Sequence, residues 1–224
     1  FRQATLDNGL TVVGEIEPSA HSAAIGFFVK TGARDEDASL MGVSHYLEHM
    51  MFKGTDRRSA EQVDRDFDDL GANHNAFTTS ELTAFWCHCL PEHLERGEEV
   101  LADILRPSLR GEDFDDEKKV ILEEIAMYQD NPFWVLYERA IECFYGAHPL
   151  SHRVLGTAET VGGMTRDQMA SYFEGRYSAD NTVVAGAGRL DFDAMVRALR
   201  THCGGWRRTD ATRQHPAIPS LTDD

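Results

Sequence analysis

Short segments of alternating or clustered apolar residues predict β-strands at several places along the chain. Residues 5–13, TLDNGLTVV, hold Asn8-Gly9 between apolar flanks, and this pair accepts the positive φ angles of a tight hairpin turn. Residues 23–30, AAIGFFVK, form an apolar run that is typical of a buried strand. Three further strands are predicted at residues 73–78, 82–90 and 182–187.

Longer segments between these strands carry the start and stop signals of helices. Ser59 is a good N-cap with Gln62 in the first turn, and Gly71 would end the same helix. Residues 146–164 are rich in Gly and Pro and predict a loop. The predicted helices cover about residues 39–52, 60–70, 92–105 and 113–129, a segment ending near Tyr145, and residues 165–174 and 191–203. Strands and helices alternate with hairpin-like pairs, so the fold class is α+β, with a largely antiparallel sheet packed against several long helices.

Charge and the absence of long apolar runs restrict the partners of this chain. Its formal net charge of -16 argues against nucleic acid and against an anionic membrane surface, because both need clustered Lys and Arg. The charge favours solubility, and secondarily an attraction for basic peptides. No apolar run is long enough for a membrane span. The N-terminus has neither a signal-peptide pattern nor an initiator Met, so we expect a trimmed chain.

The four cysteines do not form a metal-binding or disulfide pattern. Cys87 and Cys89 alternate along a predicted strand and should point the same way, and no CxxC pair is present. We therefore expect free thiols in a reducing compartment, which favours the cytoplasm.

The motif His45-Tyr46-Leu47-Glu48-His49 indicates a metal centre. Residues four apart share one face of a helix, so His45 and His49 can direct two imidazoles at one ion. Glu48 can lie beside that ion and take a proton from a bound water. This HxxEH spacing is the inverted form of the HExxH zinc motif. By itself it is a modest signal, because a solvated helix face can carry the same residues.

The wider stretch GVSHYLEHMMFKGT closely resembles the signature of the pitrilysin and mitochondrial-processing-peptidase family of inverted zincins. The resemblance implies a third zinc ligand, a Glu on a helix about 75 residues after the second His, with another Glu seven residues before it. Glu124 lies 75 positions after His49, and Glu117 lies seven before Glu124, on the same helix face. Glu123 competes by proximity, but it points about 100° away round the helix. We therefore expect His45, His49 and Glu124 to hold one Zn²⁺ and Glu117 to orient a ligand.

The resemblance also covers Gly71 to Thr79 and implies an edge strand that binds substrate. Asn75, Ala76, Phe77 and Thr78 would lie beside the zinc, and an extended peptide would add to them as a further β-strand. Later segments, including YSADNTVVAGAG, extend the resemblance to nearly the whole chain. An ordinary edge strand remains the alternative interpretation of this segment.

The resemblance implies a zinc endopeptidase acting on extended peptides or presequences through a zinc-bound water that Glu48 activates. Residues 1–208 would form the catalytic domain, and residues 209–224 a linker or tail toward a second homologous domain or subunit that would support full activity. Two alternatives stay open: a non-catalytic peptide-binding or assembly subunit of the same family, and a hydrolase of non-peptide substrates.

Overall fold

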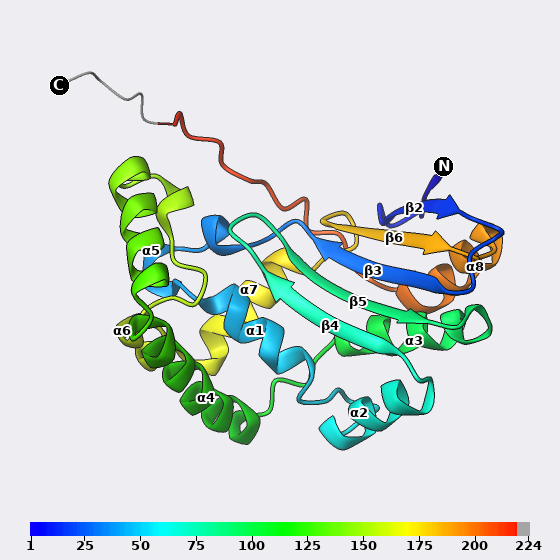
Figure 1. The fold of residues 1–224 in the computed structure, drawn as a ribbon, viewed down its shortest axis with the longest axis horizontal. Coiled ribbons are helices and arrows are strands. Elements are labelled where there is room, and N and C mark those ends of the chain that lie inside the picture. The colour runs from blue at the N-terminus through cyan, green and yellow to red at the C-terminus, as the bar shows by residue number, and fades with distance from the viewer. Residues whose placement is uncertain (219–224) are drawn as a thin grey trace.

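A single mixed sheet forms the centre of the protein, as seen in a computed structural model that describes residues 1–218 (Figure 1). The strands are β1 (Arg2–Thr5), β2 (Thr11–Ile16), β3 (Ala23–Val29), β4 (Asn73–Thr78), β5 (Thr83–Cys89) and β6 (Thr182–Gly188). Their order in the sheet is β1-β2-β6-β3-β5-β4. Only the pair β2–β6 is parallel among the described strands, so the predicted antiparallel character of the sheet is confirmed.

Helices connect and cover these strands. They are α1 (Val43–Met51), α2 (Ala60–Asp69), α3 (Leu94–Ile104), α4 (Gly111–Gln129), α5 (Pro132–Tyr145), α6 (Ala158–Gly163), α7 (Arg166–Arg176) and α8 (Phe192–Cys203). Short 3-10 helices lie at Ala33–Asp35, Ala38–Leu40, Pro91–His93 and Pro149–Ser151. None of the helices within residues 1–218 is both long enough and apolar enough to cross a membrane.

The core lies between one face of the sheet and the helices that pack on it. Along β3, the side chains of Ile25, Phe27 and Val29 are almost fully buried, and Phe85 of β5 lies directly opposite Phe27 in the register. Helix α3 contacts β3 and β5 on this side, and α8 contacts β2. Phe28, which points the other way, is only half-buried. This alternation follows the two-residue period of a strand with one covered face.

Two predictions of local structure need correction. The helix expected from about residue 39 begins at Val43, because Gly42 before it has φ +95° and the preceding turn is a separate 3-10 helix. The loop expected at residues 146–164 contains α6, which Thr157 opens by accepting a hydrogen bond from the backbone N–H of Thr160 at 3.1 Å. A six-residue helix whose last two residues are glycines offers too little apolar periodicity to be detected from sequence.

Residues 204–218, which follow α8, have no regular secondary structure and are mostly exposed or half-buried, although Trp206 is buried. Arg213 forms two hydrogen bonds to the carboxylate of Asp35, at 2.8 and 2.6 Å, and so ties this segment to the start of the chain. The last six positions of the predicted linker or tail at 209–224 lie outside the described residues.

Candidate metal centre

Helix α1 carries two histidines on one face, and a buried carboxylate fixes where the helix begins. His45 and His49 are four residues apart, so their side chains project from the same side. Glu36 accepts hydrogen bonds from the backbone N–H groups of Gly42 and Ser44, both at 2.8 Å. Burial raises the pKa of Glu36 to about 8. The start of the helix, and with it the direction of both imidazoles, is therefore held by contacts outside the helix.

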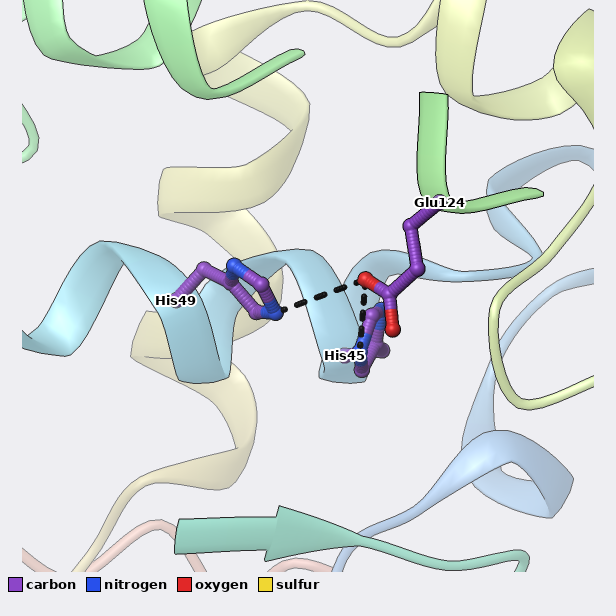
Figure 2. Close-up of side chains that lie close together, drawn as sticks. All are labelled: His45, His49 and Glu124. Carbon is purple, nitrogen blue, oxygen red and sulfur yellow. Dashed lines mark ion pairs between the residues drawn. The ribbon is translucent and has the colours of Figure 1, made fainter. Parts of the chain in front are cut away.

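Helix α4 brings a carboxylate to the two imidazoles (Figure 2). Tyr46 of α1 stacks on Phe114 of α4 with ring centroids 4.8 Å apart, and its hydroxyl donates to the carbonyl oxygen of Phe114. Glu124 Oε2 lies 3.7 Å from His45 Nε2 and 3.8 Å from His49 Nε2. One ligand atom from each of the three residues lies within 4.8 Å of the others, and no second such group of His, Cys, Asp or Glu occurs within residues 1–218.

The structure distinguishes the two adjacent glutamates, Glu123 and Glu124, that could supply the third metal ligand. Glu124 is half-buried and turned toward the histidines, as Figure 2 shows. Glu123 is exposed and does not belong to the group. The angular argument from the sequence therefore selected the carboxylate that the fold brings to the imidazoles.

The three side chains fit a zinc ion by donor type and by spacing. Nitrogen and oxygen ligands about 2.0–2.2 Å from zinc at tetrahedral angles are about 3.3–3.6 Å apart, close to the separations observed. Burial, with a smaller effect of His49, lowers the pKa of His45 to about 4, so its imidazole is in the neutral form that binds metal. His45 Nδ1 is buried and has no hydrogen-bond partner among the described residues, whereas Nε2 faces Glu124.

A second carboxylate on α4 orients the outer histidine. His49 Nδ1 lies 2.8 Å from Glu117 Oε1, and Lys53 Nζ lies 2.5 Å from Glu117 Oε2. Burial would raise the pKa of Glu117, but its contacts with His49 and Lys53 outweigh this effect and lower it. A carboxylate in this place fixes the ring orientation and leaves Nε2 free for a metal. The structure thus places Glu117 against His49, whereas the contact of Lys53 was not anticipated from the sequence.

Glu48 lies on the same helix beside this group, and its carboxylate is held by the edge strand. Thr78 Oγ1 donates a hydrogen bond to Glu48 Oε2 at 2.6 Å. Burial raises the pKa of Glu48, and the bond from Thr78 partly offsets this effect. The sequence placed Thr78 among substrate-contacting residues. In the structure its side chain contacts Glu48.

The other three residues of the expected substrate-binding segment lie on β4 at the edge of the sheet. Asn75 and Phe77 are exposed on one face of the strand, and Ala76 is half-buried on the other. Asn75 Oδ1 accepts a hydrogen bond from the backbone N–H of Ala76 at 2.8 Å. Because β4 has a neighbour on one side only, its outer edge is available for a further strand.

Comparison with known proteins now gives this fold and site a class. The chain belongs to the insulinase family of peptidases, family M16, whose model matches residues 11–158. It is 40% identical over 204 residues to an uncharacterized zinc protease of Mycobacterium tuberculosis, which covers 91% of this chain and 47% of that protein. It is 35% identical over 207 residues to the uncharacterized zinc protease YmxG of Bacillus subtilis, covering 92% of this chain and 50% of that protein. The chain thus spans about half the length of these relatives.

Solved structures confirm the fold. A protease from Helicobacter pylori matches with a TM-score of 0.90 at 24% identity, over 99% of this chain and 53% of that one. Pitrilysin matches with a TM-score of 0.86 at 23% identity, over 99% of this chain and 24% of its own. An inactive M16 peptidase domain from Pseudomonas fluorescens also matches, with a TM-score of 0.82 at 17% identity, over 99% and 53%. The fold is therefore shared by domains with and without activity, so the side chains of the site must decide between them.

Proposed function

We propose that this chain is the catalytic part of a zinc-dependent endopeptidase that cleaves extended peptides. The observation that carries the proposal is the convergence of His45, His49 and Glu124 from two helices, with ligand atoms within 4.8 Å of one another. Three protein ligands leave one tetrahedral position free, which distinguishes catalytic zinc sites from structural ones. The naming of relatives as zinc proteases supports the same function.

The residues around the metal centre divide the chemistry between them. A zinc ion bound there would lower the pKa of a water ligand to about 7 and polarise the peptide carbonyl. Glu48 accepts the proton of the attacking water and donates it to the leaving amine. The raised pKa of Glu48, caused by burial, makes its carboxylate a stronger base than an exposed one. Thr78 occupies one oxygen of that carboxylate and leaves the other for the water.

Substrate would bind along β4 as an additional strand, with Asn75, Ala76 and Phe77 beside it. Beyond Thr78, where β4 ends, lies a cavity of about 530 Å³ that reaches α5 and residues 150–155. Its wall contains four aromatic side chains, those of Tyr128, Trp134, Tyr137 and Tyr145.

The aromatic side chains of this cavity favour an apolar substrate side chain. Glu138 and Arg153 also line it: Arg153 Nε is 3.3 Å from the Glu138 carboxylate, and Arg153 Nη2 is 2.6 Å from that of Glu142. Glu138 thus shares its one cation with a second carboxylate. We propose that the cavity receives a large aromatic or aliphatic side chain of the bound peptide.

A second homologous domain or subunit would complete the enzyme. This proposal rests on the shared half-length match to the relatives and on the surface of α5. None of the residues of α5 is buried, and the side chains of Phe133 and Leu136 are 65% and 70% exposed. Large apolar side chains in such a continuous exposed group are typical of surfaces that another domain covers.

Metal analysis combined with a cleavage assay tests the proposed function. With the second domain or subunit present, we expect about one zinc per chain, cleavage of a quenched peptide that stops with a chelator, and loss of cleavage in Glu48→Gln with zinc retained. If Glu48→Gln cleaves as fast as the parent protein, Glu48 is not the base.

The competing candidate is a non-catalytic peptide-binding or assembly subunit, because an inactive M16 domain shares this fold. It predicts that protein purified without chelator contains no zinc and binds peptides without cleaving them.

A further inference from the structure

Lys53 stands at the end of a chain of polar contacts that begins at the metal centre. Its Nζ lies 2.5 Å from Glu117 Oε2, and the other oxygen of that carboxylate lies 2.8 Å from His49 Nδ1. One carboxylate thus connects a lysine to a histidine whose Nε2 faces Glu124. Each oxygen of Glu117 has a single, different partner, so the orientation of the carboxylate depends on both.

The backbone of Lys53 is also held, which separates this contact from an ordinary surface ion pair. Its N–H donates to the carbonyl oxygen of Met50 at 3.2 Å, and its own carbonyl oxygen accepts from Arg110 Nη2 at 2.6 Å. Arg110 is the residue before α4, and its Nε donates to Asp113 of that helix at 2.6 Å. Lys53 is therefore fixed between the end of α1 and the start of α4.

Burial makes this contact matter for Glu117. The side chain of Glu117 is 7% exposed, against 37% for that of Lys53. A carboxylate that is this deeply buried depends on protein partners, because little water can replace a lost one. Without the lysine, Glu117 Oε2 would lose its partner, and the carboxylate could rotate away from His49.

We propose that Lys53 is a positioning residue of the metal centre: it holds Glu117 so that His49 keeps Nε2 directed at the ion. This inference rests on the proposed zinc site and adds a residue that touches neither the metal nor the substrate. Outer contacts of this kind change metal affinity by about 10-fold to 100-fold when they are removed.

The test is zinc affinity, measured by competition with a chromophoric chelator on the full chain. Lys53→Met should bind zinc about tenfold more weakly than the parent, and Lys53→Arg, which keeps a cation able to reach Glu117, should stay within about twofold. Lys119→Met is the matched control, because Lys119 lies on α4 and pairs with the exposed Asp116 at 2.8 Å. It should bind zinc as the parent does.

A double-mutant cycle separates positioning from a general loss of structure. If Lys53 acts through Glu117, then Lys53→Met should have little further effect on zinc affinity in a Glu117→Gln background. The free energies of unfolding of the metal-free proteins show whether Lys53→Met is folded. If it is not, the zinc affinity is measured on Lys53→Gln. A parent that binds zinc while Lys53→Met binds equally well would overturn this inference alone. A parent that binds no zinc would overturn the proposed function together with it.

Discussion

The hydrogen bond from Thr78 to Glu48 connects β4 to helix α1, and we expect it to affect the rate of peptide cleavage. Thr78→Val keeps the shape of the side chain but removes the donor that lies 2.6 Å from Glu48 Oε2. Hydrogen bonds to charged groups contribute about 1.5–3 kcal/mol, and each 1.4 kcal/mol corresponds to a factor of ten. We expect kcat to fall about tenfold with KM and zinc content little changed, because the freed carboxylate no longer points one oxygen at the attacking water.

Steady-state kinetics on a quenched peptide measure this effect. Thr78→Ser retains a hydroxyl and should recover most of the rate. A valine variant with the kcat of the parent would show that Glu48 does not need this contact.

At the residue scale, spacing along the helices could predict which of these side chains the fold brings together, but not Lys53. Four-residue spacing on a helix brings His45 and His49 together, and the seven-residue spacing on α4 puts Glu117 and Glu124 on one face. Lys53 lies beyond the end of α1. Its partner belongs to another helix, and no periodicity connects the two. Contacts of that kind depend on how helices pack, which local spacing does not contain.

At the element scale, helix α3 contains a buried acid that makes stability depend on pH. Glu98 is 1% exposed, and neither of its carboxylate oxygens has a hydrogen-bond partner within the described residues. Burial, with a smaller effect of Glu95, raises its pKa from 4.5 to about 9. The folded state therefore keeps a proton that the unfolded chain releases above about pH 4.5.

The folded state loses stability as pH rises. The contribution of Glu98 to the free energy of unfolding is fully present below about pH 4.5 and declines up to about pH 9. Glu98→Gln does not titrate at this position. Between about pH 5 and pH 8 we expect the free energy of unfolding of the parent to fall by on the order of 2 kcal/mol relative to that of Glu98→Gln, a value that allows for relaxation around the buried charge. Urea unfolding at several pH values measures the difference. Glu123→Gln, which removes an exposed carboxylate of α4, should follow the parent. Parallel pH profiles for the parent and Glu98→Gln would contradict the argument.

The same scale shows why element boundaries were harder to predict than elements. Asn8-Gly9 and the Ser59–Gln62 capping box are local signals, and both occur where expected. The start of α1 is set by Glu36 from outside the helix and by close packing at Gly42. A Cβ at Gly42 would lie 2.6 Å from the carbonyl oxygen of Leu155. A residue more than a hundred positions away in the chain thus determines this boundary, and sequence spacing cannot reveal it.

At the scale of the whole molecule, the cavity beyond Thr78 joins elements that are far apart in the chain. The end of β4, the facing sides of α4 and α5, and residues 150–155 all contribute to it. Trp134 is 38% exposed and stands in contact with Tyr128 and Tyr137, at centroid distances of 5.4 and 5.8 Å. These aromatic side chains are not used by the core, so a bound substrate is the occupant that would bury them.

Removing one aromatic wall of the cavity should change which peptides are cleaved. A peptide-library digest by the parent should show enrichment of large aromatic or aliphatic residues at one position near the scissile bond. Trp134→Ala should lower kcat/KM about tenfold for peptides with Phe at that position and much less for peptides with Ala there, because about 1–2 kcal/mol of apolar contact is lost. Leu136→Ala is the control: it lies on the same helix, 70% exposed and outside the cavity, and should leave the preference unchanged. An equal loss for all peptides in Trp134→Ala would assign Trp134 to the support of α5. An enrichment of Lys or Arg in the parent digest would contradict the proposed preference for apolar side chains.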